Sequence, residues 1–377
     1  MHITGNVPGL GGARVEIAGG RIRAADAAAP QENWLAPGLV DLQVNGFAGV
    51  DFSDPRLEPE QAAGVLPALW ATGVTSFFPT LVTNTPEALC RGFRTLEAAR
   101  RHSPAFDRAV PGYHLEGPYL SPGGARGVHE PRWMHLPDWD EFRRFQEAAG
   151  GRIAVVTVAP ELPGALDFIA RAAAAGLVVA IGHTDCAPED IHRAADAGAR
   201  MSTHLGNGCA QMLDRHANPL WAQMTDDRLS AGIICDGFHL PTDVVRTFVR
   251  AKGIERLVLV TDATHVATLP PGPYSIASTA IELLPSGKVV KADGACLAGS
   301  ALGMDRAVAN FMRLGGATLE DALRAAAANP ARLLGGAGMC AAVATGEPAN
   351  LVRFRMLDGV LEIEAVWLAG ENVYARY

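Results

Sequence analysis

Short apolar runs alternate with amphipathic stretches along most of this chain. The runs are bounded by Gly, Pro or polar residues and lack a strict apolar–polar alternation. Runs of this kind are typical of parallel strands that are buried on both faces. Eight are found, at residues 39–46, 74–81, 110–117, 153–160, 178–183, 201–206, 229–236 and 257–262.

The stretches between these runs repeat apolar positions three and four residues apart, which predicts helices. They lie at about 59–72, 86–101, 139–149, 164–175, 187–198, 213–225, 241–252, 302–314 and 318–328. Thr318 and Asp321 predict a capping box at the start of the last helix, and Asn329-Pro330 predicts its end. Eight strands with helices between them predict a (β/α)8 TIM barrel more readily than an open sheet.

Both ends of the chain show a different pattern, with short alternating strands separated by Gly, Pro and Asn. Neither end is long enough to form a stable domain alone, but the two ends together could form one. We therefore predict a small β-sandwich domain from residues 1–38 and 344–377, and a catalytic barrel domain from residues 39–343. The Pro- and Gly-rich stretch 265–298 predicts a hairpin insertion after the eighth strand.

Polar side chains occur where the apolar runs end. Glu116, His183 and Asp262 each close a run, while His204 and His239 follow shortly after one. In a barrel, the carboxyl ends of the strands carry the chemistry. One Glu with two His residues is a ligand set that suits a divalent metal and leaves a position for water.

Composition narrows the class of protein. The 377-residue chain is 49% hydrophobic and 19% charged, which is enough to bury a large core. Its net charge of −8 argues against nucleic acid or an anionic membrane as partner, and an anionic substrate would need local cations. No apolar stretch is long enough for a membrane span, and no signal peptide is recognisable. Six scattered cysteines without a Cys-x-x-Cys pair predict a reducing, cytoplasmic location.

Seven motifs in order resemble those of the N-acetylglucosamine-6-phosphate deacetylases, which belong to the amidohydrolase superfamily. The resemblance runs from residue 39 to about 335. It implies a metal-dependent barrel with a split small domain, a homodimer, and removal of the acetyl group from a small-molecule amino-sugar phosphate. The motifs are Asp-Leu-Gln-Val-Asn-Gly (41–46), His-Leu-Glu-Gly-Pro (114–118), Gly-His-Thr (182–184), Thr-His-Leu (203–205), Asp-Gly-Phe-His (236–239), Val-Thr-Asp-Ala-Thr (260–264) and Leu-Ala-Gly-Ser (297–300).

The metal ligands expected from these motifs are Glu116, His183 and His204. Asp262 is the candidate general base and acid, which takes a proton from the attacking water and delivers it to the leaving amine. His239 is the candidate donor to the amide oxygen and also a substrate contact. Against these stand simpler structural roles, such as a turn-capping carboxylate for Asp262 and a surface histidine for His239.

The first strand departs from most of the superfamily, in which His-x-His helps to hold a second metal. This chain has Gln43 and Asn45 instead, as do some deacetylases of the resembled family. Because amides are poor ligands for such an ion, we expect one tightly bound divalent metal. Zinc is the first expectation, and iron or another divalent ion fits the same ligands.

Substrate contacts follow from the resemblance. Arg215, eleven positions after His204, is expected to meet the sugar phosphate, together with backbone amides at Asn207 and Gly208. His129 corresponds to a histidine that contacts the sugar.

Two departures leave the exact substrate open. The chain has Gly206-Asn207-Gly208-Cys209 where an aromatic residue followed by Asn-Ala-Met is usual, and Asp214 precedes Arg215 where a basic residue is usual. Gly206 could admit a bulkier group, and Asp214 would weaken a phosphate site. A changed sugar, phosphate position or N-acyl group therefore remains open. Asp236 is expected to brace its loop.

Two alternatives remain at this stage. The first keeps the site but changes the substrate to a cyclic amide or imide, or to a deaminase substrate. The Gln43 and Asn45 pair and Glu116 disfavour it, because such relatives usually carry His-x-His and often a bridging lysine. The second is a barrel-like scaffold without catalysis, and the presence of all three ligands and Asp262 counts against it.

Overall fold

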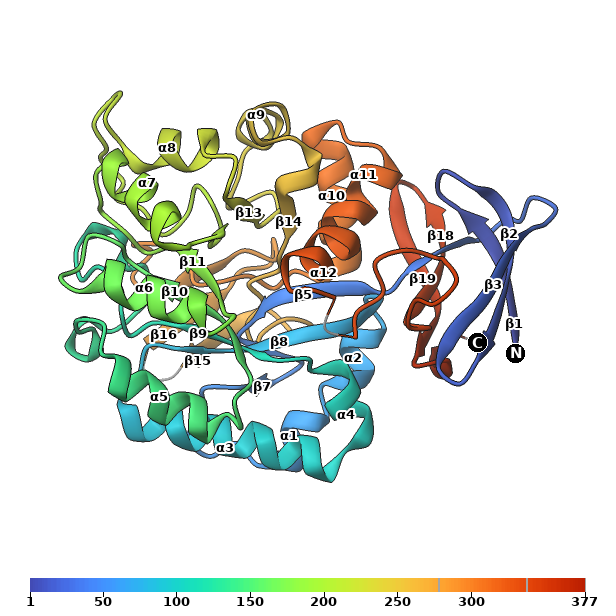
Figure 1. The fold of residues 1–377 in the computed structure, drawn as a ribbon, viewed down its shortest axis with the longest axis horizontal. Coiled ribbons are helices and arrows are strands. Elements are labelled where there is room, and N and C mark those ends of the chain that lie inside the picture. The colour runs from blue at the N-terminus through green and yellow to red at the C-terminus, as the bar shows by residue number, and fades with distance from the viewer. Residues whose placement is uncertain (277–278, 337, 377) are drawn as a thin grey trace.

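A barrel and a separate sheet make up the molecule. The computed structural model describes residues 1–276, 279–336 and 338–376. Residues 277 and 278 of the predicted insertion, residue 337 of the predicted barrel domain and residue 377 of the predicted small domain lie outside this part. Figure 1 shows the barrel at the left and the sheet at the right, where both chain ends lie.

Eight parallel strands form the barrel, and they follow one another in chain order, as the sequence predicts. Each falls within or next to its predicted range. They are β5 (Leu39–Val44), β8 (Val74–Val82), β9 (Tyr113–Glu116), β10 (Ile153–Val158), β11 (Val178–Ile181), β12 (Met201–Ser202), β13 (Ser230–Ile233) and β14 (Leu257–Leu259).

The barrel closes between its first strand and the segment just after its last one. The Thr261 hydroxyl donates to Asp41 Oδ2 at 2.6 Å, and the Thr261 amide donates to Asp41 Oδ1 at 3.2 Å. A bridge between Val44 and Ala263 continues the pairing, and the Asn45 amide donates to the Ala263 carbonyl at 2.8 Å. This closure brings the end of β5 beside the end of β14 at the carboxyl face of the barrel.

Helices surround the barrel at most of the predicted positions. They are α1 (Pro59–Ala63), α2 (Leu66–Trp70), α3 (Pro86–His102), α4 (Pro104–Ala109), α5 (Trp139–Ala148), α6 (Ala165–Ala174), α7 (Pro188–Ala197), α8 (Pro219–Thr225), α9 (Thr242–Lys252), α10 (Met304–Gly315), α11 (Leu319–Leu323) and α12 (Asn329–Leu333). Short 3-10 turns lie at Gly124–Arg126, Pro131–Trp133 and Ile254–Arg256.

Two predicted helices are divided or shortened in the structure. The stretch 59–72 is divided into α1 and α2, with Pro67 in the first turn of α2. The stretch 213–225 becomes helical only at Pro219, because the Asn218 side chain caps α8 by accepting from the amides of Leu220 and Trp221. Residues before this cap are left free to form a loop at the mouth of the barrel.

Asn329-Pro330 does not end the preceding helix, contrary to the prediction. The capping box of Thr318 and Asp321 is present, and α11 then continues through a π-helical turn, Arg324–Ala328, into α12. Pro330 lies in the first turn of α12, directly after this π-helical turn. The Asn329 side chain donates to the carbonyls of Ile254 and Leu257 at 2.7 Å each, which ties this turn to the start of β14.

The two chain ends form one seven-stranded sheet in the order β20-β19-β18-β4-β1-β2-β3. The sheet folds over itself, so that residues such as Val15, Leu35, Leu351 and Trp367 share one core. The predicted sandwich is thus a single continuous sheet. Its strands are β1 (His2–Val7), β2 (Gly11–Ala18), β3 (Arg21–Ala27), β4 (Trp34–Pro37), β18 (Leu351–Leu357), β19 (Val360–Leu368) and β20 (Glu371–Ala375).

The domain limits predicted at 38/39 and 343/344 stay a prediction. β4 ends at Pro37 and β5 begins at Leu39, so the chain passes from the small sheet into the barrel there. Between α12 and β18 the chain returns to the small sheet, where the Pro348 backbone forms a bridge with Arg21.

The predicted insertion is a three-stranded antiparallel sheet: β15 (Gly272–Ile276), β16 (Thr279–Leu283) and β17 (Val289–Lys291). It has its own small core, which includes Ile281, Leu283 and Val289. A two-stranded ribbon, β6 (Gly46–Phe47) and β7 (Val50–Asp51), follows the first barrel strand. The insertion forms one wall above the carboxyl face of the barrel.

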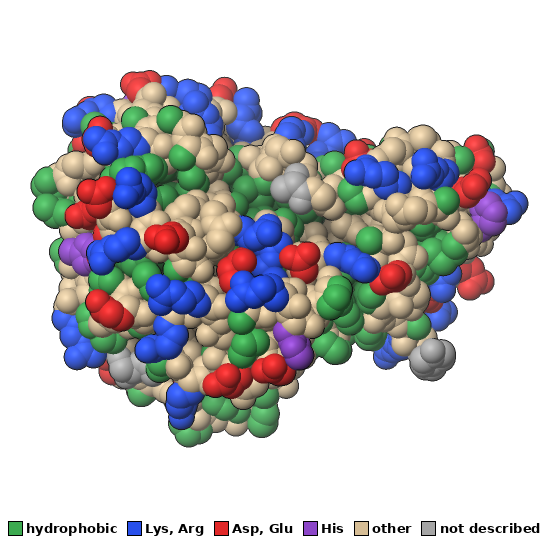
Figure 2. Space-filling model, turned by 60° about the horizontal axis from the view of Figure 1, so that its bottom comes forward, with side chains coloured by type: hydrophobic (Ala, Val, Ile, Leu, Met, Phe, Trp, Pro, Cys, Tyr) green, Lys and Arg blue, Asp and Glu red, His purple; other side chains and the backbone are tan. Residues whose placement is uncertain are grey.

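Charged side chains of both signs are mixed on the face seen in Figure 2, which looks at the molecule from the lower side of Figure 1. The folded terminal sheet projects as a lobe at the right. None of the helices in the described residues has the length and apolar character needed to cross a membrane.

Candidate active site

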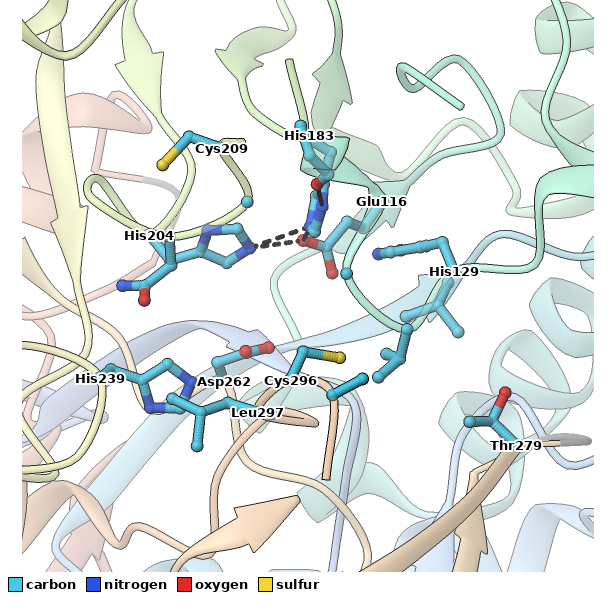
Figure 3. A pocket seen from close by; sticks show the side chains of 18 of the residues that line it. Glu116, His129, His183, His204, Cys209, His239, Asp262, Thr279, Cys296 and Leu297 are labelled. Atoms are coloured by element: carbon cyan, nitrogen blue, oxygen red, sulfur yellow. Dashed lines mark hydrogen bonds and ion pairs between the residues drawn. The ribbon is translucent and has the colours of Figure 1, made fainter. Parts of the chain in front are cut away.

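The polar residues singled out at the strand ends face one cavity. Glu116 ends β9, His183 and His204 follow β11 and β12 by two residues, and His239 and Asp262 follow β13 and β14. All five line a cavity of about 680 Å³ at the carboxyl face of the barrel. Figure 3 shows Glu116, His183 and His204 pointing toward one another, with Asp262 and His239 below them.

Three of these residues have an unusual backbone conformation. The φ angles of His183, His204 and Asp262 are 49°, 30° and 50°, in the left-handed region that non-glycine residues seldom adopt. Such strain is concentrated at functional sites and persists only where the surrounding structure enforces it. The turns at these three strand ends therefore direct the side chains into the cavity at the expense of local backbone strain.

Glu116, His183 and His204 bring three ligand atoms to one point. Glu116 Oε1 lies 3.2 Å from His183 Nε2 and 3.1 Å from His204 Nε2, and the two nitrogens are 3.1 Å apart. Ligands of a four-coordinate ion with bonds of about 2.1 Å are roughly 3.4 Å from one another, so the spacing suits one metal ion. His183 Nδ1 donates to the Ala125 carbonyl at 2.9 Å, which leaves the Nε2 lone pair for the metal.

The charges of this cluster favour an ionised carboxylate. Burial alone would raise the pKa of Glu116, but the hydrogen bonds and charges of His183 and His204 hold that pKa well below its usual range. Glu116 is 2% exposed, so solvent screens these interactions weakly. The cluster therefore presents an anionic oxygen and two imidazole nitrogens, which is the donor chemistry a divalent ion requires.

His129 lies beside this cluster. A ring nitrogen of His129 and one ligand atom each of Glu116 and His183 lie within 4.8 Å of one another, and Figure 3 shows the ring turned toward Glu116. Its Nδ1 is 2.8 Å from the Thr83 hydroxyl. Burial, with the nearby charge of His183, lowers the pKa of His129 to about 3, so the ring is neutral at physiological pH. A neutral ring here can contact a substrate hydroxyl.

Gln43 and Asn45 connect the metal cluster to Asp262. Gln43 Nε2 donates to Glu116 Oε1 at 2.9 Å and to Asp262 Oδ1 at 3.1 Å, and Asn45 Nδ2 donates to Asp262 Oδ1 at 2.7 Å. The carboxylates of Glu116 and Asp262 determine which way the two side-chain amides point. If either amide were flipped, its carbonyl oxygen would face a carboxylate oxygen, and neither could donate a hydrogen bond. Sequence reasoning considered these amides only as poor ligands and missed their role as donors, although Gln43 on β5 and Asn45 just after it are two residues apart, which in an extended chain directs both side chains to one side.

Asp262 and His239 are each held by specific neighbours. Burial and the charge of Glu116 raise the pKa of Asp262 to about 6, against the opposing effects of His204, His239 and Asn45. His239 Nδ1 donates to Asp236 Oδ2 at 2.7 Å, and the amides of Phe238 and His239 donate to Asp236 Oδ1. This bond leaves His239 Nε2 for the cavity, and the expected role of Asp236 as a brace for its loop is confirmed.

The loop after His204 packs directly on the ligand histidines. Gly208 has a φ of 59°, and a Cβ there would lie 2.9 Å from His204 Cε1 and 3.1 Å from His183 Nδ1. A Cβ at Gly206 would meet Leu240 and Phe248 in the core. Gly206 also lines the cavity, and the expectation that it admits a bulkier group stays a prediction. The loop contributes Asn207 and Gly208 to the cavity lining as well.

Arg215 is exposed and is not among the described residues that line the cavity. Its carbonyl accepts from the Trp221 indole at 3.2 Å. The Asp214 carboxylate accepts from the amides of His216 and Ala217 and so shapes the turn before α8. The role of Arg215 at a phosphate stays a prediction. Lys288, in the turn before β17, does line the cavity and was missed by sequence reasoning.

Comparison with known proteins identifies the family. The sequence profile of the Amidohydrolase family matches residues 34–373 of the chain. The chain belongs to the amidohydrolase family. As an amidohydrolase it is a hydrolase, and Glu116, His129 and His183 form a group of buried side chains that could hold a metal ion.

Relatives with known activities confirm the resemblance seen in the sequence motifs. An N-acetylglucosamine-6-phosphate deacetylase of Danio rerio is 32% identical over 91% of this amidohydrolase and 85% of its own length. An N-acetylgalactosamine-6-phosphate deacetylase of Escherichia coli O157:H7 is 31% identical over 89% of the chain and 87% of its own length.

Solved structures agree over the whole chain. The N-acetyl-D-glucosamine-6-phosphate deacetylase of Mycobacterium smegmatis matches with a TM-score of 0.90 at 32% identity, covering 99% of this chain and 100% of its own. A mutant of that enzyme was solved in complex with N-acetyl-D-glucosamine-6-phosphate, and it matches with a TM-score of 0.89. The barrel and the sheet from both termini are therefore shared with this group of enzymes.

Proposed function

We propose that this amidohydrolase removes the acetyl group from an N-acetyl-amino-sugar phosphate, converting N-acetylglucosamine 6-phosphate, or a close analogue, to glucosamine 6-phosphate and acetate. The observation that carries the proposal is the convergence of Glu116, His183 and His204 beside Asp262 in one cavity. The names of the relatives support it, since they act on the 6-phosphates of N-acetylglucosamine or N-acetylgalactosamine.

One divalent ion, with zinc as first choice, is the proposed cofactor, held by Glu116, His183 and His204. Such an ion supplies Lewis acidity, which polarises the acetyl carbonyl and makes water acidic enough to ionise near neutral pH. The side-chain amides of Gln43 and Asn45 favour one bound ion over two. Their N–H groups donate to Glu116 Oε1 and Asp262 Oδ1, the carboxylate oxygens that a second cation would need as ligands.

Asp262 is the proposed general base and acid. It takes a proton from the attacking water and delivers it to the amine nitrogen as the C–N bond breaks. Gln43 and Asn45 hold its Oδ1, so Oδ2 is the oxygen available to the water. His239 donates from Nε2 to the amide oxygen as negative charge develops there.

The sugar contacts proposed from the resemblance are His129, Asn207, Gly208 and Arg215, in addition to His239. The first three line the cavity beside the metal cluster. The resemblance also supports a cytoplasmic location and a homodimer. Sedimentation of the purified protein would test the homodimer.

A substrate panel tests the function. The metal-reconstituted enzyme should release acetate from N-acetylglucosamine 6-phosphate or N-acetylgalactosamine 6-phosphate, measured by a coupled acetate assay. The neutral sugars and a cyclic imide such as dihydrouracil are the comparison substrates. Hydrolysis of the cyclic substrate with no release of acetate from any sugar would contradict the proposal.

A further inference from the structure

The cavity of this acidic protein contains little positive charge of its own. Among the described residues that line it, Lys288 is the single lysine or arginine, while Glu116, Glu130 and Asp262 are acidic. Glu130 has a partner outside the lining, Arg132, at 3.8 Å. A phosphorylated substrate must leave water to enter this cavity, and its charge then requires a nearby cation.

The insertion holds Lys288 at a position where its charge could compensate a bound phosphate. The Leu284 amide donates to the Lys288 carbonyl, and the Gly287 amide donates to the Leu284 carbonyl, both at 2.9 Å, so a tight turn fixes its backbone. Val289 next to it is 2% exposed in the core of the insertion. Because side chains alternate along a strand, Lys288 and Val290 project to the opposite face, and both line the cavity.

The Lys288 ammonium has no partner among the described residues: no ion pair or side-chain hydrogen bond engages it. Lys291, three residues further along at the end of β17, forms an ion pair with Asp293 at 2.9 Å and does not line the cavity. Lys288 is half-buried, so its charge is partly shielded from water and remains uncompensated within the protein. An unpaired cation at the wall of a substrate cavity is available for an anionic ligand.

We propose that Lys288 is the specificity-determining residue that binds the phosphate of the substrate, and that the insertion 265–298 supplies this phosphate contact. The proposal rests on the proposed function for the identity of the substrate. The amide at C2 and the phosphate at C6 lie on opposite sides of a sugar ring. A sugar whose amide reaches the cluster of Glu116, His183 and His204 therefore directs its phosphate away from that cluster, toward other parts of the cavity lining, which include Lys288.

The test compares Lys288→Ala with Lys291→Ala, which removes the same charge from a nearby position of the insertion outside the cavity. For the phosphorylated substrate, Lys288→Ala should raise KM about ten- to a hundredfold, the usual scale for a charge-assisted contact. Its kinetics on the neutral sugar should remain near those of the wild type, which also shows that the variant is folded. Lys291→Ala should match the wild type on both sugars, and Lys288→Arg should restore much of the preference.

Calorimetric titration with glucosamine 6-phosphate and with glucosamine measures binding without turnover. Lys288→Ala should lose most of the difference between the two ligands, and Lys291→Ala should keep it. Unchanged KM and binding in Lys288→Ala, or a loss confined to Arg215→Ala, would overturn the proposal while deacetylation stands. Loss of phosphate-dependent binding in Lys288→Ala, in an enzyme that releases no acetate, would uphold Lys288 and refute the proposed function.

Discussion

At the scale of single residues, the site depends on donors that hold carboxylates in place. Gln43 and Asn45 replace a pair of metal ligands with amide N–H groups that reach Glu116 and Asp262. Asp236 does the same for His239. Asp262 and His239 thus each have one side-chain atom held by a neighbour and another left for the cavity, which is the arrangement that preorganised acid–base chemistry needs.

Asp262→Asn should keep the metal and the fold but lower kcat by about a hundredfold to ten-thousandfold, because the amide cannot accept the proton. In the wild type, kcat/KM should fall as pH drops through about 6 or somewhat below, since Asp262 must be ionised to act as a base and its pKa is about 6. Steady-state rates across pH, with metal content by elemental analysis, measure both effects.

The exposed variant Asp243→Asn, at the start of α9, is the control for Asp262→Asn and should keep the wild-type rate. Wild-type turnover by Asp262→Asn with metal bound would assign proton transfer to another residue.

At the scale of elements, the closure between β5 and β14 supports the site. Asp41 is 1% exposed and accepts from the Thr261 hydroxyl, the Thr261 amide and the Gln43 amide. The residues that follow these positions are Gln43, Asn45 and Asp262, so the junction that closes the barrel also sets the spacing of the chemistry. Burial, opposed by these hydrogen bonds and assisted by the charge of Asp262, raises the pKa of Asp41 to about 7.

Asp41→Asn should change how stability depends on pH. The wild-type carboxyl ionises near 3.8 when unfolded and near 7 when folded, so between these values the folded state holds the extra proton. Its contribution to the free energy of unfolding therefore falls as pH rises from about 4 to 7, by up to about 4 kcal/mol, and is constant above. Asparagine cannot titrate, so the variant should lose this slope.

Urea unfolding at pH 5 and pH 8 measures the difference between wild type and Asp41→Asn. Asp26→Asn, on an exposed position of β3, should keep the wild-type pH dependence. An identical change with pH in wild type and Asp41→Asn would show that Asp41 is ionised in the folded protein throughout this range.

At the scale of the whole molecule, the ligand set joins three barrel strands that are distant in sequence. Glu116 comes from β9, while His183 and His204 follow β11 and β12. A metal ion that needs these three side chains together can bind the folded barrel, whereas the unfolded chain does not bring them together. Binding therefore stabilises the fold in proportion to the logarithm of the metal concentration.

Removing the metal with a chelator should lower the unfolding temperature. At a free metal concentration of a hundred times Kd, the stabilisation is about 2.7 kcal/mol. Wild type should hold about one equivalent of divalent ion by elemental analysis. Glu116→Ala should hold almost none, and its unfolding temperature should not respond to the chelator.

Glu189→Ala, at an exposed position of α7, should retain both the metal and the response to the chelator. Full metal content in Glu116→Ala would rule out this ligand set. Two tightly held ions in the wild type would refute the inference drawn from Gln43 and Asn45.

The sequence by itself determined the elements and the candidate residues. Burial on both faces leaves a continuous apolar run in each parallel strand, so the eight barrel strands were recognisable locally. Glu116, His183 and Asp262 were recognisable because each interrupts apolar sequence at a strand end. The order of seven motifs predicted the family, which the relatives confirm.

Tertiary structure alone decided how these pieces meet. The hydrogen bonds from Gln43 to Glu116 and Asp262 join residues 73 and 219 positions apart, and no local pattern encodes such a contact. The exposure of Arg215 and the cavity position of Lys288 depend on how a loop and an insertion fold over the barrel. The spacing of apolar residues along the sequence indicates whether a side chain is buried. Which atoms that side chain faces depends on packing between segments that are distant in the sequence.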